Sequence, residues 1–248
     1  MSNYDTVVVD IEGTITPITF VKETLFPYVV SGCKAFLDRT WDLPELKSYI
    51  ELLREQAEKD VKDNLPEAVL IPTESEGSAE EIKSSIIKNI KWQVKADRKI
   101  GALKAFQGYM WKEGYESGEL RGVIYDDVVP KFDQWISQGK KIYIYSSGSV
   151  PAQKLLVSFS TKGDLTNYFS GYFDTTIGLK VQTESYEAIA KEINKSSHSI
   201  LFVSDNIKEI VAAHQAGYQV VISDRPGNAP LDVESEQFKI ITSFDQID

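Results

Sequence analysis

The chain has 248 residues, of which 42% are hydrophobic and 26% are charged, so it can bury a large core and has a globular composition. Its net charge of -10 argues against nucleic acid or an anionic membrane surface as a partner, because both attract basic faces. A single cysteine excludes an intramolecular disulfide, and neither a spanning apolar run nor a secretory leader is visible, which together predict an intracellular protein.

The first apolar run, Val7, Val8 and Val9, predicts a buried strand that is followed at once by Asp10. In open α/β sheets the chemistry lies just beyond the carboxyl ends of the strands. The strand end therefore makes Asp10 a candidate active-site residue, although Asp and Gly are also common in turns without a function.

Helical patterns follow, broken by an acidic, proline-bearing loop over residues 64–77. Helices are expected over residues 20–37 with an interruption at Pro27, 43–61, 78–94 and 100–110. Ser78 and Glu81 have the spacing of a capping box, which predicts the start of the third helix. The single cysteine, Cys33, lies in the first helix and is expected to pack there. Residues 113–122, which contain three glycines, are expected to return the chain.

From Val123 onward, strand patterns alternate with helical ones. Strands are expected over residues 141–145, 173–176, 199–203, 219–222 and 239–241. Helices are expected over residues 128–137, 151–159, 185–193 and 207–216. Short links between alternating strands and helices imply right-handed crossovers and a parallel sheet.

The organisation is discontinuous, because a single strand cannot stand alone as a domain. Residues 1–18 and 122–248 are therefore predicted to form one α/β catalytic core with a Rossmann-like parallel sheet. Residues 19–121 would be an inserted helical cap. The insertion leaves the sheet directly after Asp10, a position that suits a lid over an active site.

Four segments of the predicted core carry residues that together suit phosphoryl transfer. Asp10 is the candidate nucleophile, since a covalent aspartyl intermediate splits hydrolysis into two easier steps. A hard cation such as Mg²⁺ is expected between carboxylate and phosphate, held by Asp10 and Asp205. Ser146 can receive phosphate oxygens together with backbone amides, and Lys180 can neutralise the remaining charge. Glu12 is placed to protonate the leaving oxygen and then to activate water.

This order of motifs resembles the haloacid-dehalogenase phosphatase superfamily, in which an aspartate motif, a Ser/Thr motif, a lysine and an acidic metal motif follow one another and a helical cap is inserted after the first. The likeness extends over nearly the whole chain to the enolase-phosphatase (acireductone synthase) family of methionine salvage. The segments that carry it are Asp10-Ile11-Glu12-Gly13-Thr14 with Thr16-Pro17-Ile18, residues 107–120, Tyr145-Ser146-Ser147-Gly148-Ser149, Glu184-Ser185-Tyr186 and Arg225-Pro226-Gly227-Asn228.

The resemblance implies a haloacid-dehalogenase-like fold and a cytosolic, monomeric enzyme that uses one Mg²⁺ per chain; a nuclear pool is compatible with it. The implied substrate is a small phosphorylated diketone, 2,3-diketo-5-methylthiopentyl-1-phosphate, which would be enolised and then dephosphorylated to the acireductone. Asp10 would be nucleophile and metal ligand, Glu12 would give its carbonyl to the metal and its side chain to acid and base catalysis, and Asp205 would complete the protein ligands. The implied substrate-binding residues are Ser146, Ser147 and Lys180.

Two alternatives stay open at this point. A phosphatase of another small phosphate ester would use the same core residues. A non-catalytic protein is the alternative of another class. A phospho-accepting, receiver-like module would be small and would lack the helical insertion, and an interaction protein on this fold would be expected to have lost Asp10 or Asp205. The aromatic residues of the cap stretch, Tyr109, Trp111 and Tyr115, are expected to offer the apolar surface that a methylthio tail requires; the alternative is that they pack the cap against the core.

Overall fold

The computed structural model describes residues 4–248, apart from the side chain of residue 234. The chain divides into two compact units, an α/β unit of residues up to Val21 with Tyr115–Asp248 and a helical unit, Lys22–Gly114. The boundaries predicted from sequence, at 18/19 and 121/122, differ from these by a few residues. The α/β unit is therefore assembled from two separate stretches of chain.

A six-stranded sheet forms the centre of the α/β unit, with every neighbouring pair parallel and the order β3-β2-β1-β4-β5-β6. The strands are β1 (Thr6–Val9), β2 (Lys141–Tyr145), β3 (Phe169–Phe173), β4 (Ile200–Ser204), β5 (Gln219–Ser223) and β6 (Lys239–Ile241). All residues of β1 are buried, which explains its run of valines. The predicted α/β class with a parallel, Rossmann-like sheet is confirmed.

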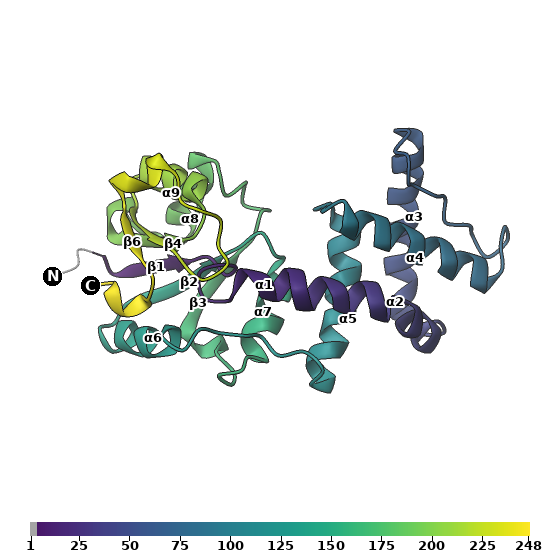
Figure 1. The fold of residues 1–248 in the computed structure, drawn as a ribbon, viewed down its shortest axis with the longest axis horizontal. Helices are drawn as coiled ribbons and strands as arrows, with labels where there is room; N and C mark the ends of the chain where they lie inside the picture. Colours follow the sequence, from purple (N-terminus) through teal and green to yellow (C-terminus); the bar gives the residue numbers. More distant parts are fainter. Residues whose placement is uncertain (1–3) are drawn as a thin grey trace. The chain divides into compact units, whose positions relative to one another are not determined.

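Helices cover both faces of this sheet. In Figure 1, α6 (Val128–Ser137) and α7 (Val150–Ser158) lie on one face, and α8 (Thr183–Glu192) and α9 (Ile207–Gln215) lie on the other. The second face is packed by a cluster that includes Val8, Phe202 and Ile210. From β1 the chain builds the sheet outward through β2 to β3, and from β4 it builds outward in the opposite direction through β5 to β6. The strand order therefore reverses between β1 and β4. That reversal is where doubly wound sheets bind ligands.

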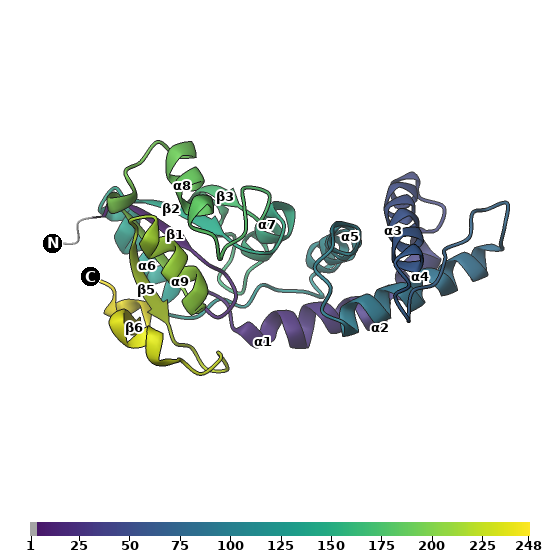
Figure 2. The same cartoon turned by 90° about the horizontal axis from the view of Figure 1, so that it is seen from above.

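The helical unit is built from α2 (Phe26–Thr40), α3 (Pro44–Lys62), α4 (Ala79–Lys95) and most of α5 (Gly101–Ser117), which Figure 2 shows from a second direction. The predicted capping box of Ser78 and Glu81 is present at the start of α4. Cys33 is completely buried in α2, and burial raises the pKa of its thiol to about 12, so it packs as predicted. Among the described residues, no helix is both apolar and long enough to cross a membrane.

The predicted interruption at Pro27 is wrong, because the helix continues through it. A short α1 (Ile18–Phe20) leads into a π-helical turn (Val21–Leu25), which is followed directly by α2. Proline lacks an N–H and its ring disturbs the preceding turn. The wider π turn covers the residues just before Pro27, where a regular α-helix would need the N–H that proline lacks. Pro27 then occupies the first turn of α2, where no N–H is required.

Two other predicted elements are displaced. The third strand covers Phe169–Phe173 and not residues 173–176, because Asp174 ends it in a turn: its Oδ1 accepts hydrogen bonds from the N–H and hydroxyl of Thr176. The last helix of the insertion, α5, continues to Ser117 through the stretch expected to be a return loop. Gly114, one of the three glycines of that stretch, lies inside this helix, although a glycine costs helix stability.

The aromatic residues of the cap stretch are in packing contacts, with Trp111 and Tyr115 buried and Tyr109 half-buried. The indole N–H of Trp111 donates to the carbonyl of Leu25 at 3.0 Å, and its ring stacks with that of Phe26. Tyr109 stacks on Tyr49 with ring centroids 4.5 Å apart. Tyr115, which belongs to the α/β unit, is 1% exposed. These contacts show that the stretch packs within the protein; they do not bear on its predicted role in substrate specificity.

Short helical turns complete the chain. They are 3-10 turns at Thr166–Tyr168, Ser197–Ser199, Val233–Gln237 and Phe244–Gln246. Gly217, at φ +91°, ends α9 in the left-handed conformation expected of a glycine after a helix.

Candidate active site

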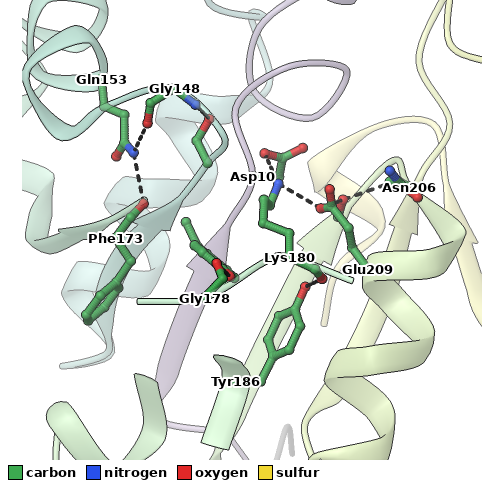
Figure 3. A network of polar contacts seen from close by, with 12 residues as sticks. Asp10, Gly148, Gln153, Phe173, Gly178, Lys180, Tyr186, Asn206 and Glu209 are labelled. Atoms are coloured by element: carbon green, nitrogen blue, oxygen red, sulfur yellow. Dashed lines mark hydrogen bonds and ion pairs between the residues drawn. The ribbon is translucent and has the colours of Figure 1, made fainter. Parts of the chain in front are cut away.

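Asp10 directly follows the central strand and is 6% exposed. Its Oδ1 accepts a hydrogen bond of 2.6 Å from Nζ of Lys180, a residue 170 positions away in the chain. The same ammonium lies 2.7 Å from Oε2 of Glu209, which belongs to the first turn of α9. Figure 3 shows Lys180 between the two carboxylates. Two residues predicted to be catalytic, Asp10 and Lys180, are thus in direct contact.

The environment keeps Lys180 charged although it is buried. Burial alone would lower the pKa of its ammonium, but the carboxylates of Asp10 and Glu209 outweigh burial and raise that pKa above its ordinary value. Burial raises the pKa of the Glu209 carboxyl, whereas Lys180 and a 2.9 Å hydrogen bond from the hydroxyl of Ser204 favour its charged form. A fixed positive charge therefore stands beside the predicted nucleophile.

Asp205 follows β4, the strand that neighbours β1, and its carboxylate reaches over Gly13. A Cβ on Gly13 would lie 2.4 Å from Oδ2 of Asp205, and the φ of Gly13 is +69°, so both space and backbone require glycine. Burial, followed by the nearby charges of Asp10 and Glu209, raises the pKa of Asp205 to about 7. Negative charge is therefore concentrated at this edge of the sheet.

The oxygen atoms at this edge of the sheet can be compared with those that Mg²⁺ requires. Within residues 4–248, no group of three or more His, Cys, Asp or Glu side chains is arranged to hold a metal ion. The predicted site needs only two such side chains, Asp10 and Asp205, with the backbone carbonyl of Glu12 and several waters, as Mg²⁺ prefers. The repulsion that Asp205 experiences from Asp10 is relieved by a divalent cation. The residues present fit the ion.

Glu12 lies in a compact turn after β1. The N–H groups of residues 14–16 converge on the carbonyl of Ile11 at 3.0 to 3.2 Å, which closes the turn on itself. Glu12 is partly exposed within it, two residues beyond Asp10. Its role in proton transfer stays a prediction.

Ser146 and Ser147 follow β2, the other neighbour of β1. Ser146 is 3% exposed, and its Oγ accepts a hydrogen bond from the N–H of Gly148 at 3.3 Å. Gln153 closes this loop, since its Nε2 donates to the carbonyls of Gly148 and Phe173, each at 2.8 Å (Figure 3). Both serines thus lie at the same sheet edge as Asp10, and their role in substrate binding stays a prediction.

Glu209 had no role in the sequence-based prediction, yet it is the second partner of Lys180. A signal was available, because Glu209 lies four residues after Asp205. A residue one helical turn beyond a strand end can point back toward that end. The sequence does not show that Lys180 is the residue that Glu209 contacts.

Two segments that enter the prediction only through the resemblance also contact the site. The hydroxyl of Tyr186 donates to the carbonyl of Lys180 at 2.6 Å. The Nδ2 of Asn228 donates to the carbonyls of Gly13 at 2.9 Å and of Ser223 at 3.0 Å, joining the turn after β1 to the end of β5.

Comparisons with known proteins agree with this arrangement. A family model described as haloacid dehalogenase-like hydrolase matches residues 4–217. A protein of Anopheles gambiae named Enolase-phosphatase E1 is 47% identical over 97% of this chain and 81% of its own length. The protein of that name from Xenopus tropicalis is 46% identical over 97% of this chain and 93% of its own length. The chain belongs to the enolase-phosphatase E1 family of haloacid dehalogenase-like hydrolases. The predicted family and the predicted enzyme class are confirmed.

Solved structures of other proteins have the same fold as this chain. The UTR4 protein of Saccharomyces cerevisiae superimposes with a TM-score of 0.76 and 33% identity, covering 98% of this chain and all of that one. CbbY from Rhodobacter sphaeroides, solved in complex with phosphate, has a TM-score of 0.58 and 15% identity over 98% of this chain and 96% of that one. The second likeness shows the fold alone.

Proposed function

We propose that this chain is a bifunctional enolase-phosphatase that converts 2,3-diketo-5-methylthiopentyl-1-phosphate into the acireductone 1,2-dihydroxy-3-keto-5-methylthiopentene. The observation that carries the proposal is the contact between Asp10 and Lys180 at the end of β1. This contact supports a role for Asp10 as nucleophile, because the ammonium of Lys180 orients one of its two carboxylate oxygens. The choice of substrate is supported by relatives named for enolase and phosphatase activity, which are 43% to 48% identical over nearly the whole chain.

The phosphatase step uses the oxygen of Asp10 that Lys180 does not bind. This Oδ2 attacks phosphorus, an O–P bond forms, and the bond from phosphorus to the substrate oxygen breaks as Glu12 gives that oxygen a proton. Glu12 then removes a proton from water, which attacks the aspartyl-phosphate and releases phosphate and Asp10. Lys180 balances negative charge throughout, and Ser146 and Ser147 hold phosphate oxygens.

A Mg²⁺ ion, one per chain, would be held by Asp10, Asp205 and the carbonyl of Glu12. It would supply the positive charge that allows an anionic phosphate to approach an anionic nucleophile. In the enolase step, a base removes a proton from the carbon next to a carbonyl of the diketone, and negative charge develops on the carbonyl oxygen. The ammonium of Lys180, together with the positive charge that a bound ion would supply, suits that development as well.

The test compares substrates and follows both half-reactions. Phosphate release is measured on the diketone phosphate and on a panel of other small phosphate esters, while NMR in D₂O follows deuterium incorporation next to the carbonyl. Turnover highest on the diketone phosphate, with exchange preceding phosphate release, supports the proposal. Preference for another ester without exchange would favour a different phosphatase. A stable aspartyl-phosphate without turnover would favour a phospho-accepting protein.

We also propose that the chain works as a cytosolic monomer with a small molecule as its partner. Light scattering on a size-exclusion column tests the oligomeric state. A mass of two chains at micromolar concentration would count against it.

A further inference from the structure

The loop that carries Lys180 into the site has little apolar anchoring of its own. The side chains next to Lys180, those of Leu179 and Val181, are 53% and 51% exposed. Gly178 has φ +147°, and a Cβ there would lie 2.2 Å from Oγ of Ser185, so the loop passes closely over α8. Packing of the neighbouring side chains therefore does not fix the position of Lys180.

Buried hydroxyl groups hold the backbone of this loop, one for each of three successive carbonyls. The donors and acceptors are Tyr145 with Gly178 at 2.9 Å, Ser185 with Leu179 at 2.8 Å, and Tyr186 with Lys180 at 2.6 Å. None of the three donor residues is more than 2% exposed. Figure 3 shows Tyr186 reaching up to the loop from the side opposite the Lys180 ammonium. The backbone on both sides of Lys180 is thus bound from within the core.

The three donors are themselves held firmly. Tyr145 ends β2 and Tyr186 lies in α8, and their rings meet edge to face with centroids 5.5 Å apart. The Nζ of Lys180 also lies 5.7 Å from the centroid of the Tyr145 ring. The hydroxyl of Tyr218 donates to the carbonyl of Tyr186 at 2.8 Å, so it binds the backbone of α8 and none of the three loop carbonyls. The loop is therefore tied to rigid elements of the sheet and of the helix beneath it.

We propose that Tyr145, Ser185 and Tyr186 are positioning residues that set the place of the Lys180 ammonium against Asp10. Tyr186 carries the largest share, because it binds the carbonyl of Lys180 itself. The inference rests on the proposed phosphatase reaction, in which the ammonium must meet both the nucleophile and the phosphoryl oxygens. A displacement of about 1 Å at a reacting centre can reduce a rate by about a hundredfold.

The experiment compares Tyr186→Phe with Tyr218→Phe. Each change removes one buried hydroxyl that donates to a backbone carbonyl and keeps the ring, but only the first bond ends on Lys180. We expect Tyr186→Phe to lower kcat by about tenfold or more, with a smaller change in KM. Inhibition by inorganic phosphate should weaken in the same variant. Tyr218→Phe should keep both properties near those of the parent protein, while the two variants lose similar amounts of thermal stability.

Equal kinetic losses in the two tyrosine variants would overturn the inference and leave the hydroxyls with a structural role. Ser185→Ala gives an independent reading if Tyr186→Phe does not fold, and it should lower kcat without weakening Mg²⁺ dependence. All variants are measured on whichever phosphate ester the parent protein hydrolyses fastest. Failure of the diketone phosphate as a substrate would therefore refute the proposed function, whereas unchanged kcat in both Ser185→Ala and Tyr186→Phe would refute this inference.

Discussion

The buried ion pair of Asp127 and Arg225 allows a quantitative test of what stabilises the α/β unit. The Nη2 of Arg225 lies 2.7 Å from Oδ2 of Asp127, and the two side chains are 4% and 16% exposed. The same oxygen of Asp127 accepts the N–H of Phe244 at 2.6 Å. The guanidinium also lies over the rings of Tyr125 and Phe244. Removal of the Asp127 charge would leave Arg225 buried without its counter-ion.

We predict that Asp127→Asn, which keeps the size of the side chain, destabilises the folded protein substantially. Removing one partner of a buried pair costs about 3–5 kcal/mol, and the partial exposure of Asp127 favours the lower end, about 3 kcal/mol. For a chain of this length, about 2–4 °C of Tm corresponds to each kcal/mol, so Tm should fall by about 6–12 °C. Thermal unfolding followed by circular dichroism measures this shift.

The adjacent residue supplies the control. Asp126 is 94% exposed and pairs with Lys162, so Asp126→Asn should cost less than about 1 kcal/mol. Burial opposes the charge of Asp127, but hydrogen bonds from Arg225 and Phe244 hold the pKa of its carboxyl below the usual value. Its stabilisation is therefore present above the unfolded pKa of about 3.9 and is lost as pH falls through the folded value. Equal Tm shifts for the two variants, or a difference that does not shrink as pH falls below about 3.9, would refute this reasoning.

The remaining predictions concern the site and the helical unit. Asp10→Asn should abolish phosphate release, because an amide cannot attack phosphorus, and turnover above a tenth of the parent rate without deamidation would contradict it. Lys180→Ala should lower kcat by about 10²–10³-fold, whereas Asp205→Ala should mainly raise the Mg²⁺ concentration for half-maximal activity; identical Mg²⁺ curves would make these roles wrong. Gly13→Ala should weaken Mg²⁺ binding measured by calorimetry, because its Cβ would meet the Asp205 carboxylate at 2.4 Å. Trp111→Ala should lower Tm and reduce turnover of the diketone phosphate and of p-nitrophenyl phosphate alike; selective loss on the diketone would instead show a specificity role.

The sequence is most informative where local chemistry and burial agree. The valines of β1 predict a buried strand correctly. The capping box at Ser78, together with the isoleucines that follow at i+4 spacing, correctly predicts the start of α4 and its buried face. The path through Pro27 is not predictable in this way, since a π turn compensates for the missing N–H only in the context of the whole helix. The same holds for the end of α5, which continues through Gly114 to Ser117 although a glycine costs stability inside a helix.

In the site, residue types were predictable and partnerships were not. Asp10 and Asp205 each directly follow a buried strand, where open α/β sheets place their chemistry, whereas Lys180 lies in the loop after β3 and is singled out by its place in the order of motifs. The contact of Glu209 with Lys180 depends on how the loop before α8 crosses the sheet edge, and no spacing in the chain encodes that crossing. The hydroxyl of Tyr186 is hidden for the same reason, because a tyrosine in a helix more often signals packing.

The central position of β1 has a consequence for how the protein is made. Thr6 pairs with Lys141 on one side and with Ile200 on the other, so β1 leaves the ribosome before both of its neighbours and must wait for partners more than a hundred residues later. The contiguous residues Lys22–Gly114 can make their contacts much sooner. Pairings so distant in sequence form slowly, and the unpaired valines are exposed to aggregation meanwhile. Helical signal in circular dichroism therefore does not establish that a refolded sample is native, whereas phosphatase activity does, since Asp10 reaches its place only when the strand before it has been inserted.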